Sequence, residues 1–456
     1  MSSASVRRLA RSTGQAPAAR EVRILHLGLG NFFRAHQAWY TEHTPDASEW
    51  GIAAFTGRTA ALADALAPQD GLYTLVTRGE EADAFEVVGS LSRVHPGADH
   101  AEWLGYARSP RLAVISLTVT EAGYPRGADG ALDRDDPRVA ADIQVLRTDP
   151  TAVVATAPAR LLAALVARDR AGLAPVAVMP CDNLPDNGAV TARIVRDLAE
   201  TVDPGLVEVV DHSSFVTTMV DRITPRTTAT DRDLVQTRTT WMDAAPVVTE
   251  PFSEWVISGE FPAGRPAWDR SGATLTDDLA PFEQRKLWLL NGAHSLLAYA
   301  GPLRGHTTVA DAIADPVCRG WALEWWGEAA RHLTLPEPEV ERYRAALVER
   351  FSNPRIRHLL AQIAVDGSQK IPVRVLPVLR AERAAGREPV AATRTIAAWI
   401  RHLRGEGVPV TDRDEVVAAA AGRLDAAVPR ILALLDGPLG DDSAVVSAVL
   451  HHLDQP

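Results

Sequence analysis

The sequence predicts an α/β protein in which a mostly parallel sheet is followed by a largely helical C-terminal part. Three observations predict this architecture. Short apolar runs alternate with helical patterns over the first half of the chain, as expected of βαβ units. A turn containing two glycines joins the first apolar run to the first helical stretch. After about residue 278, helical patterns dominate. We therefore expect an N-terminal Rossmann-type domain with added strands, then a mostly α-helical C-terminal domain.

The strands of the first domain are expected at its apolar runs. The run Val22–Leu27 is typical of a buried strand, and a helical pattern follows the glycine turn to about His43. Shorter runs at residues 72–77 and 84–91 predict the added strands. The other strands are expected over residues 51–55, 112–118 and 174–179, with a helix over 157–171 before the last of them.

The second domain is expected to begin with a long helix, because Pro281 stands where a helix can start and the pattern runs to Tyr299. We place the two domains at residues 22–278 and 279–456. Residues 1–21 are expected to form a disordered leader, since the first twenty are rich in Arg, Ser and Ala and contain no acid; a transit peptide is the alternative. Further helical patterns lie at 309–333, 339–351, 354–365, 393–403, 414–435 and 443–453.

The composition is that of a soluble globular protein. The net charge of −11 is spread along 456 residues, which argues against a nucleic-acid partner. No apolar run reaches the roughly 18 residues of a membrane span, so no membrane partner is expected. Cys181 and Cys318 are the only cysteines, too few for a disulfide framework, which favours a reducing, cytoplasmic location. No cluster of metal ligands is apparent, and we expect no metal. The oligomeric state stays open.

Lysine is almost absent from the chain. Of 47 basic residues only Lys286 and Lys370 are lysines, and the rest are arginines. Arginine cannot lose its proton in a protein, whereas lysine can. The two lysines are therefore candidates for chemistry that arginine cannot perform, although chance survival is the alternative for each.

The glycine turn is the candidate nucleotide site. Gly28-x-Gly30 follows the first strand, where glycines permit a tight turn and the close approach of a pyrophosphate. Phe33 replaces the usual third glycine, and a tight turn without a ligand is the alternative. The second strand ends at Phe55 without the acid that holds the adenosine ribose. Arg58 could instead meet a 2′-phosphate or simply be solvated, so NAD and NADP both remain open.

The predicted helix from Pro281 carries a polar set on one face. At 100° per residue, Glu283, Lys286, Asn291 and His294 fall within about 140° of arc. A lysine beside apolar side chains can have its pKa lowered by desolvation, toward the range of a general base. Asn and His can donate hydrogen bonds to an oxygen that acquires negative charge. The alternative is a mixed polar face packed on another domain.

Asn183 is one of only five asparagines and follows the strand at 174–179. Ligands of open α/β sheets bind beyond the carboxyl ends of the strands. Asn183 is therefore a candidate site residue, with an Asx-turn as the structural alternative.

These segments together resemble the polyol-specific long-chain dehydrogenase/reductase family, often called the mannitol dehydrogenase family. The resemblance runs from about Arg23 to Arg380 and more loosely beyond. It rests on five ordered motifs: Gly28-Leu-Gly-Asn-Phe-Phe-Arg-Ala-His36, Thr118-Val-Thr-Glu-Ala-Gly-Tyr124, Cys181-Asp-Asn-Leu-Pro185, Met219-Val-Asp-Arg-Ile-Thr-Pro225 and Lys286-x4-Asn291-x2-His294.

The resemblance implies a zinc-independent dehydrogenase with its active site between the two domains. It implies that Lys286 is the catalytic acid/base and that Asn183 and Asn291 stabilise the oxyanion. His294 is implied to bind the substrate, and Glu283 to lie on the proton path. For the cofactor, NAD with NADP possible, the expected contacts are Gly28, Gly30, Asn31, Phe32, Arg58 and Asp221.

The segment from Gln362 to Arg374 looks more like the fructuronate reductase branch of this family, since mannitol 2-dehydrogenases can carry an arginine at the position of Gln362. Lys370 and Arg374 could then neutralise a substrate carboxylate, and we assign Asp182 to the substrate site with them. The alternative for Arg374 is a surface or interdomain salt bridge. The pair D-fructuronate/D-mannonate is favoured slightly over D-fructose/D-mannitol, and arabinitol is a further family substrate.

Two other classes of protein are the alternatives. A nucleotide-binding regulator without catalysis needs the glycine turn but not the ordered Lys, Asn and His residues. A zinc alcohol dehydrogenase needs metal ligands that the sequence does not display. We therefore expect an enzyme that acts on a sugar, sugar acid or polyol.

Overall fold

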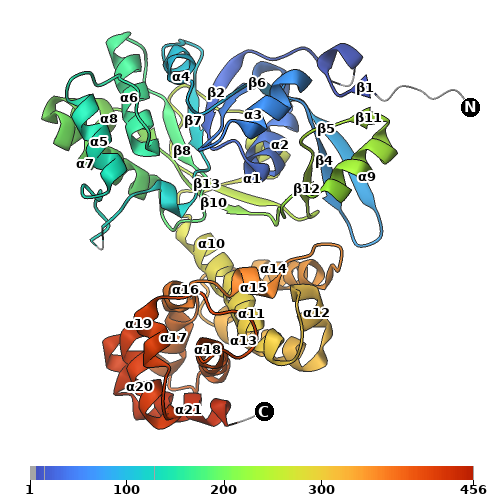
Figure 1. The fold of residues 1–456 in the computed structure, drawn as a ribbon, viewed down its shortest axis with the longest axis vertical. Helices are drawn as coiled ribbons and strands as arrows, with labels where there is room; N and C mark the ends of the chain where they lie inside the picture. Colours follow the sequence, from blue (N-terminus) through green and yellow to red (C-terminus); the bar gives the residue numbers. More distant parts are fainter. Residues whose placement is uncertain (1–6, 15, 128, 455–456) are drawn as a thin grey trace, which may run out of the picture. The chain divides into compact units, whose positions relative to one another are not determined.

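The computed structural model describes residues 7–14, 16–127 and 129–454. The chain forms two compact units, Met1–Leu279 and Ala280–Pro456. The N-terminal unit contains the sheets, and the C-terminal unit, called the helical unit below, is built from helices (Figure 1). The division after Leu279 lies one residue from the boundary predicted by the change in pattern.

The main sheet of the N-terminal unit has six parallel strands in the order β6-β3-β2-β7-β8-β9. The order reverses between β2 and β7, as in doubly wound nucleotide-binding sheets. The predicted Rossmann-type sheet is therefore confirmed, and the first two predicted strands have the observed bounds. The strands are β2 (Val22–Leu27), β3 (Gly51–Phe55), β6 (Leu91–His95), β7 (Val114–Leu117), β8 (Ala177–Pro180) and β9 (Ser214–Phe215).

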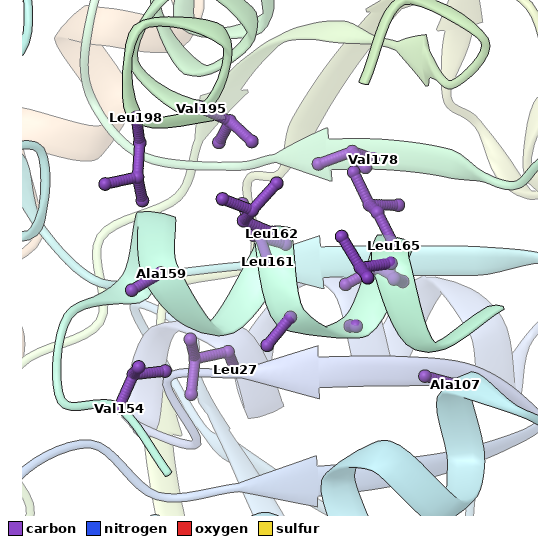
Figure 2. Close-up of a cluster of buried hydrophobic side chains, with 14 of the residues drawn as sticks. Leu27, Ala107, Val154, Ala159, Leu161, Leu162, Leu165, Val178, Val195 and Leu198 are labelled. Carbon is purple, nitrogen blue, oxygen red and sulfur yellow. The ribbon is translucent and has the colours of Figure 1, made fainter. Parts of the chain in front are cut away.

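Helices cover this sheet and close its core. Figure 2 shows α6 (Ala157–Arg170) running along the strands, with Leu162 and Leu165 beside Val178 of β8, while Val195 and Leu198 of α7 (Asn187–Val202) enter the same buried cluster. The helix α6 has Thr156 as its N-cap and Pro158 in its first turn, which explains why it starts there. The helices of this unit are α1 (Asn31–Ala35), α2 (Gln37–Glu42), α3 (Ala61–Leu66), α4 (His100–Ala107), α5 (Pro137–Leu146), α6 (Ala157–Arg170), α7 (Asn187–Val202), α8 (Val207–Asp211) and α9 (Ala229–Thr239).

The added strands form small sheets, and one prediction among them is wrong. The apolar run at 84–91 is not one strand, because Gly89 and Ser90 divide it: β5 ends at Val88, and β6 begins at Leu91 as an edge of the main sheet. The smaller sheets contain β4 (Tyr73–Arg78), β5 (Asp83–Val88) and β12 (Val247–Thr249), and β10 (Thr217–Asp221), β13 (Glu254–Ser258) and β14 (Thr274–Leu275).

The described part of the predicted leader is not a disordered segment. A short strand β1 (Arg7–Arg8) pairs with β11 (Trp241–Met242), and Leu9 is fully buried. The Arg11 guanidinium donates to the carbonyls of Gly89 and Leu91, each at 2.8 Å. The strand pairing, the burial of Leu9 and the hydrogen bonds of Arg11 order these residues, although their composition alone predicted a disordered leader. Residues 1–6 and 15 lie outside the described residues.

The helical unit is arranged around α11 (Gly292–Leu303), whose first ten residues are all buried. Helices α12, α13, α15, α16 and α18 pack against it. The predicted helix over 354–365 is reduced to a single turn, and two predicted long helices are divided, before Pro316 and at Gly422. The remaining elements are α10 (Ala280–Arg285), α12 (Val309–Ala314), α13 (Pro316–Ala330), α14 (Glu337–Ser352), α15 (Leu360–Ile363), α16 (Gly367–Arg374), α17 (Leu376–Ala384), α18 (Val390–Leu403), α19 (Asp414–Ala419), α20 (Leu424–Leu435) and α21 (Ser443–Leu453).

Among the described residues, no helix is both long enough and apolar enough to cross a lipid bilayer.

A buried carboxyl in this unit makes stability depend on pH. Glu328 of α13 accepts the N–H groups of Ala391 and Ala392 at the start of α18, at 2.8 and 3.1 Å. Burial raises the pKa of Glu328 to about 7, and the nearby carboxylates of Glu382 and Glu324 add to the rise. Since the unfolded chain loses this proton near pH 4.5, the stability from protonated Glu328 is complete below that pH and is lost as pH rises to 7.

We therefore expect the unfolding free energy of the wild type, relative to Glu328→Gln, to fall by about 3 kcal/mol between pH 4.5 and 7. Urea unfolding of both proteins at several pH values measures this difference in unfolding free energy. The variant Glu337→Gln, at an exposed position at the start of α14, is the control and should follow the wild type. Parallel curves for wild type and Glu328→Gln would contradict the raised pKa.

Candidate active site

The two glycines of the first turn are required for different reasons. Gly28 has φ +109°, and a Cβ there would lie 2.0 Å from the carbonyl oxygen of Thr118, so the fold itself requires glycine. Gly30 has φ −144°, and a Cβ on it would meet nothing closer than the Gly28 carbonyl oxygen at 3.5 Å, an ordinary contact. The fold therefore leaves the surface of Gly30 open, as the approach of a pyrophosphate to the backbone requires. The residues of the turn fit a dinucleotide.

A chain of hydrogen bonds from β2 and the end of β7 fixes this turn. His26 of β2 is fully buried, and desolvation lowers its pKa to about 3, so the ring is neutral. Its Nδ1 lies 2.9 Å from the Ser116 hydroxyl, and its Nε2 lies 3.1 Å from the Thr118 hydroxyl. Thr118 donates to the Gly28 carbonyl at 2.8 Å. The turn is thus held at the point where the strand order reverses, the usual ligand site of such sheets.

Two residues after the turn are tied into the protein. The Asn31 amide donates to Thr227 at 3.2 Å, and its oxygen accepts from Arg34 at 2.8 Å. The half-buried Phe32 ring stacks on His36 with 5.1 Å between centroids. Both residues begin α1, so their positions relative to Gly30 are fixed by the helix.

The other two predicted cofactor residues differ in exposure. Arg58 is exposed beyond the end of β3, on a turn that contains no acid. Asp221 is 3% exposed at the end of β10, where it pairs in register with Glu254 of β13.

Asn183 and Asp182 follow β8 at the carboxyl edge of the sheet. Asn183 is exposed, whereas Asp182 is buried. The Asp182 carboxylate accepts the N–H of Val119 at 3.1 Å, the N–H of Thr120 at 2.6 Å and the Tyr124 hydroxyl at 2.6 Å. Burial raises the pKa of Asp182. This carboxylate holds the loop after β7 to the loop after β8, which is a different task from the predicted substrate contact.

The helix that carries Lys286 is not a regular α-helix. Residues Lys286–Asn291 form a π-helical turn between α10 and α11, and the N–H of Gly292 donates to the carbonyl of Leu287, five residues back. In a π-turn, residues five apart lie one above the other. Lys286 and Asn291 therefore share one face, instead of the separation of about 140° expected in an α-helix.

Two buried side-chain nitrogens near Lys286 lack partners among the described residues. Lys286 is 9% exposed, Asn291 8% and His294 6%. The amide nitrogen Nδ2 of Asn291 and the ring nitrogen Nε2 of His294 form no hydrogen bond within the part of the chain that the structure describes. Burying an unpaired polar group costs about 1–3 kcal/mol. A polar ligand that reaches both atoms would satisfy them.

The surroundings of His294 keep its ring neutral. It stacks on Phe351 with 4.6 Å between centroids and meets His358 edge-on at 4.8 Å. Burial, and then the charges of His358, Arg350 and Arg374, hold the pKa of His294 well below its usual value. A neutral imidazole has one N–H donor and one acceptor, which suits a sugar hydroxyl.

Helix α16 carries the two predicted carboxylate partners. The Arg374 guanidinium donates to the Ser295 hydroxyl at 3.3 Å and to the Asn291 carbonyl oxygen at 3.5 Å, which places Arg374 beside the segment that carries Lys286. The Lys370 ammonium donates to the carbonyls of Ile363, at 3.0 Å, and Val365, and so closes the end of α15. This structural use of Lys370 was not predicted.

Glu283 is half-buried on α10, one turn before Lys286. Within the helical unit, the structure brings together Lys286, Asn291, His294 and Arg374. Asn183 and the predicted cofactor residues belong to the N-terminal unit.

Several of these partners could not be predicted from the sequence. A histidine inside an apolar strand was a visible signal for His26, but Arg350 and Phe351 resemble ordinary helix residues. A group of possible metal ligands was also missed: atoms of His306, Asp315 and Cys318 lie within 4.8 Å of one another. Arg304 donates to Asp315 at 2.5 Å beside them, so a guanidinium already supplies positive charge there.

Comparison with known proteins matches both units. The Rossmann domain of mannitol dehydrogenase matches residues 22–270, and the mannitol dehydrogenase C-terminal domain matches residues 278–455. The two matches together cover most of the chain and follow the structural division.

Individual relatives carry different names. D-mannonate oxidoreductase of Escherichia coli is 39% identical over 84% of this chain and 80% of its own length. Mannitol 2-dehydrogenase of Cereibacter sphaeroides is 37% identical over 86% of this chain and 83% of its own. The solved structure of Pseudomonas fluorescens mannitol 2-dehydrogenase, in ternary complex with NAD and D-mannitol, superposes with a TM-score of 0.82. It is 31% identical and covers 98% of this chain and 96% of its own.

Proposed function

Since this chain belongs to the mannitol dehydrogenase family of oxidoreductases, we propose that it interconverts a ketose-type sugar or uronate and its secondary alcohol with NAD(P). The favoured pair is D-fructuronate and D-mannonate. The observation that carries the proposal is the pair of buried nitrogens on Asn291 and His294 that lack partners among the described residues and lie close to Lys286 in the chain. A substrate with adjacent carbonyl and hydroxyl oxygens satisfies both.

The glycine turn holds the cofactor in this proposal. The open surface of Gly30 admits the pyrophosphate, and Asn31 and Phe32 line the same turn. When bound, the nicotinamide supplies or accepts the hydride. NAD is favoured by the solved relative that contains it. Arg58, on a turn without an acid, supports NADP as an alternative.

The protein's own residues manage the proton. Lys286 gives its proton to the carbonyl oxygen as that oxygen becomes an alkoxide, and neutral Lys286 takes it back in the oxidation. Asn183 and Asn291 donate hydrogen bonds to the same oxygen while it carries charge. Glu283, one turn from Lys286, passes the proton to solvent. His294 donates to a neighbouring hydroxyl and orients the sugar.

The preference for a uronate rests on charge. Arg374 lies against the Asn291 carbonyl, and its charge, with that of Arg350, lowers the pKa of His294. A carboxylate in this region forms charge-assisted hydrogen bonds with arginine. The second candidate, D-fructose and D-mannitol, is favoured by the solved relative with D-mannitol and by the use of Lys370 on backbone carbonyls.

The purified protein should oxidise NADH or NADPH with D-fructuronate and with D-fructose in parallel assays. A higher kcat/KM for fructuronate supports the first pair, and a higher value for fructose supports the second. A protein that turns over none of D-fructuronate, D-fructose and, with NAD(P), D-arabinitol would overturn the proposed function.

Arg374→Gln should separate the two substrates. We expect kcat/KM for D-fructuronate to fall by about 10- to 100-fold, because a charged hydrogen bond contributes roughly 1.5–3 kcal/mol. The value for D-fructose should change only a few-fold. Arg380→Gln is the matched control, because Arg380 of α17 pairs with Asp436 at the surface. Equal losses for both substrates would remove Arg374 from carboxylate recognition.

A further inference from the structure

The π-turn that carries Lys286 leaves one carbonyl without its usual partner. In an α-helix, the carbonyl of Trp288 accepts the N–H of Gly292, four residues on. Here the Gly292 N–H is directed to the carbonyls of Leu287 and Leu289 instead. A buried carbonyl without a partner costs about 1–3 kcal/mol. A donor from outside the helix can take the place of the Gly292 N–H at this carbonyl.

Two tryptophans of α13 supply such donors. The indole N–H of Trp325 donates to the Trp288 carbonyl at 2.7 Å. The indole N–H of Trp326 donates to the Leu289 carbonyl at 2.9 Å. Both tryptophans are fully buried. Adjacent residues of one helix thus donate to adjacent carbonyls of the π-turn.

Packing around the two indoles is equally specific. A Cβ on Gly292 would lie 2.4 Å from the Trp325 ring, so glycine is what lets this ring reach the turn. The Trp326 ring lies 5.8 Å from Phe351, whose ring stacks on His294. The pair therefore supports both ends of the candidate catalytic segment.

We propose that Trp325 and Trp326 are positioning residues that hold the π-turn and thereby align Lys286 with Asn291; this rests on the proposed function. Without the Trp325 N–H, the Trp288 carbonyl recovers the Gly292 N–H as its partner and the turn contracts to an α-turn. A shift of the helical hydrogen bonds by one residue rotates Asn291 by about 100° about the helix axis relative to Lys286. The alignment of the proton donor and the oxyanion donor is then lost.

Trp325→Phe and Trp326→Phe keep an aromatic ring and remove the N–H. We expect kcat to fall by about 10- to 100-fold, as for a displacement of a catalytic group by about 1 Å, while the Kd of NADH stays unchanged. In a Lys286→Ala background, the same substitutions should cause little further loss, because positioning matters only when the lysine is present. A merely structural role would give additive losses.

Trp321→Phe is the matched control, since Trp321 lies on the same helix but its ring faces Arg304 and Arg394. Val449→Ala in α21 controls for lowered stability alone. Both should keep wild-type kcat. Wild-type kcat in Trp325→Phe and Trp326→Phe, or additive losses with Lys286→Ala, would overturn the proposal.

Amide hydrogen exchange gives a readout that does not need turnover. Peptides that cover residues 286–296 should exchange faster in Trp325→Phe and Trp326→Phe than in the wild type, and not in Trp321→Phe. Unchanged exchange would overturn the proposal by itself. A wild-type protein that is inactive on every sugar, but shows this exchange pattern, would instead overturn the proposed function and leave the support of the π-turn established.

Discussion

Replacing Lys286 by alanine is expected to lower turnover by about 10³- to 10⁴-fold, because general acid–base catalysis contributes up to that amount. The Kd of NADH should remain that of the wild type, since the glycine turn belongs to the other unit. Steady-state assays and a fluorescence titration of NADH measure the two quantities. Turnover close to that of the wild type would remove Lys286 from the proposed mechanism.

One further variant and one rescue experiment separate the role of the Lys286 proton from that of its charge. Lys286→Arg keeps a positive charge but cannot release a proton, so we expect a loss as large as that of the alanine variant. An added primary amine such as methylamine should partly restore Lys286→Ala, with more rescue at higher pH in the oxidative direction. Full activity of Lys286→Arg would mean that charge alone is needed.

Gly30→Ala should impair cofactor binding without impairing the fold. Its φ of −144° suits alanine, and the nearest contact of the added Cβ is 3.5 Å, so thermal stability should be retained. A methyl group on the face that meets the pyrophosphate should raise the Kd of NADH about 100-fold, equivalent to roughly 3 kcal/mol. Unchanged affinity would place the cofactor elsewhere.

Gly28→Ala is the contrasting variant in the same turn. The added Cβ lies 2.0 Å from the Thr118 carbonyl, and φ is +109°, so we expect a loss of about 4 kcal/mol or more in unfolding free energy. Loss of the folded protein in Gly28→Ala and its retention in Gly30→Ala would show that only the second glycine serves a ligand. Similar stability of both variants would contradict this distinction.

The parallel sheet could be predicted because local composition and burial agree there. The runs at Val22–Leu27 and Gly51–Phe55 are buried on both faces, and turns end them. Prediction failed where tertiary packing overrides a local pattern. Gly89 and Ser90 divide an apolar run, and Arg11 is held by two carbonyls that are distant in sequence.

The sequence names candidate site residues, but it does not predict the geometry of the helix that carries Lys286. Spacing at 100° per residue placed Lys286 and Asn291 on one broad face, but it could not reveal the π-turn, because indoles from a helix 37 residues later support that turn. The helix α16, which carries Arg374, was not predicted because it contains Pro372, and proline usually interrupts a helix. The Asp182 carboxylate is engaged by the loop at 119–124 because β7 and β8 are neighbours in the sheet. The spacing of residues along the sequence does not reveal which strands are neighbours.

Because lysine is scarce in this chain, an NMR label attached to lysine amines can report on the proposed catalytic group with little overlap. Reductive methylation with ¹³C-formaldehyde adds NMR-visible methyl groups to lysine amines, and this chain has only two lysines. The Lys370 ammonium is engaged by two backbone carbonyls, whereas Lys286 lies close in the chain to two buried nitrogens that lack partners among the described residues. Their signals should therefore respond differently to pH and to added substrate. The protonation of Lys286 can thus be followed in the folded protein without substituting a residue.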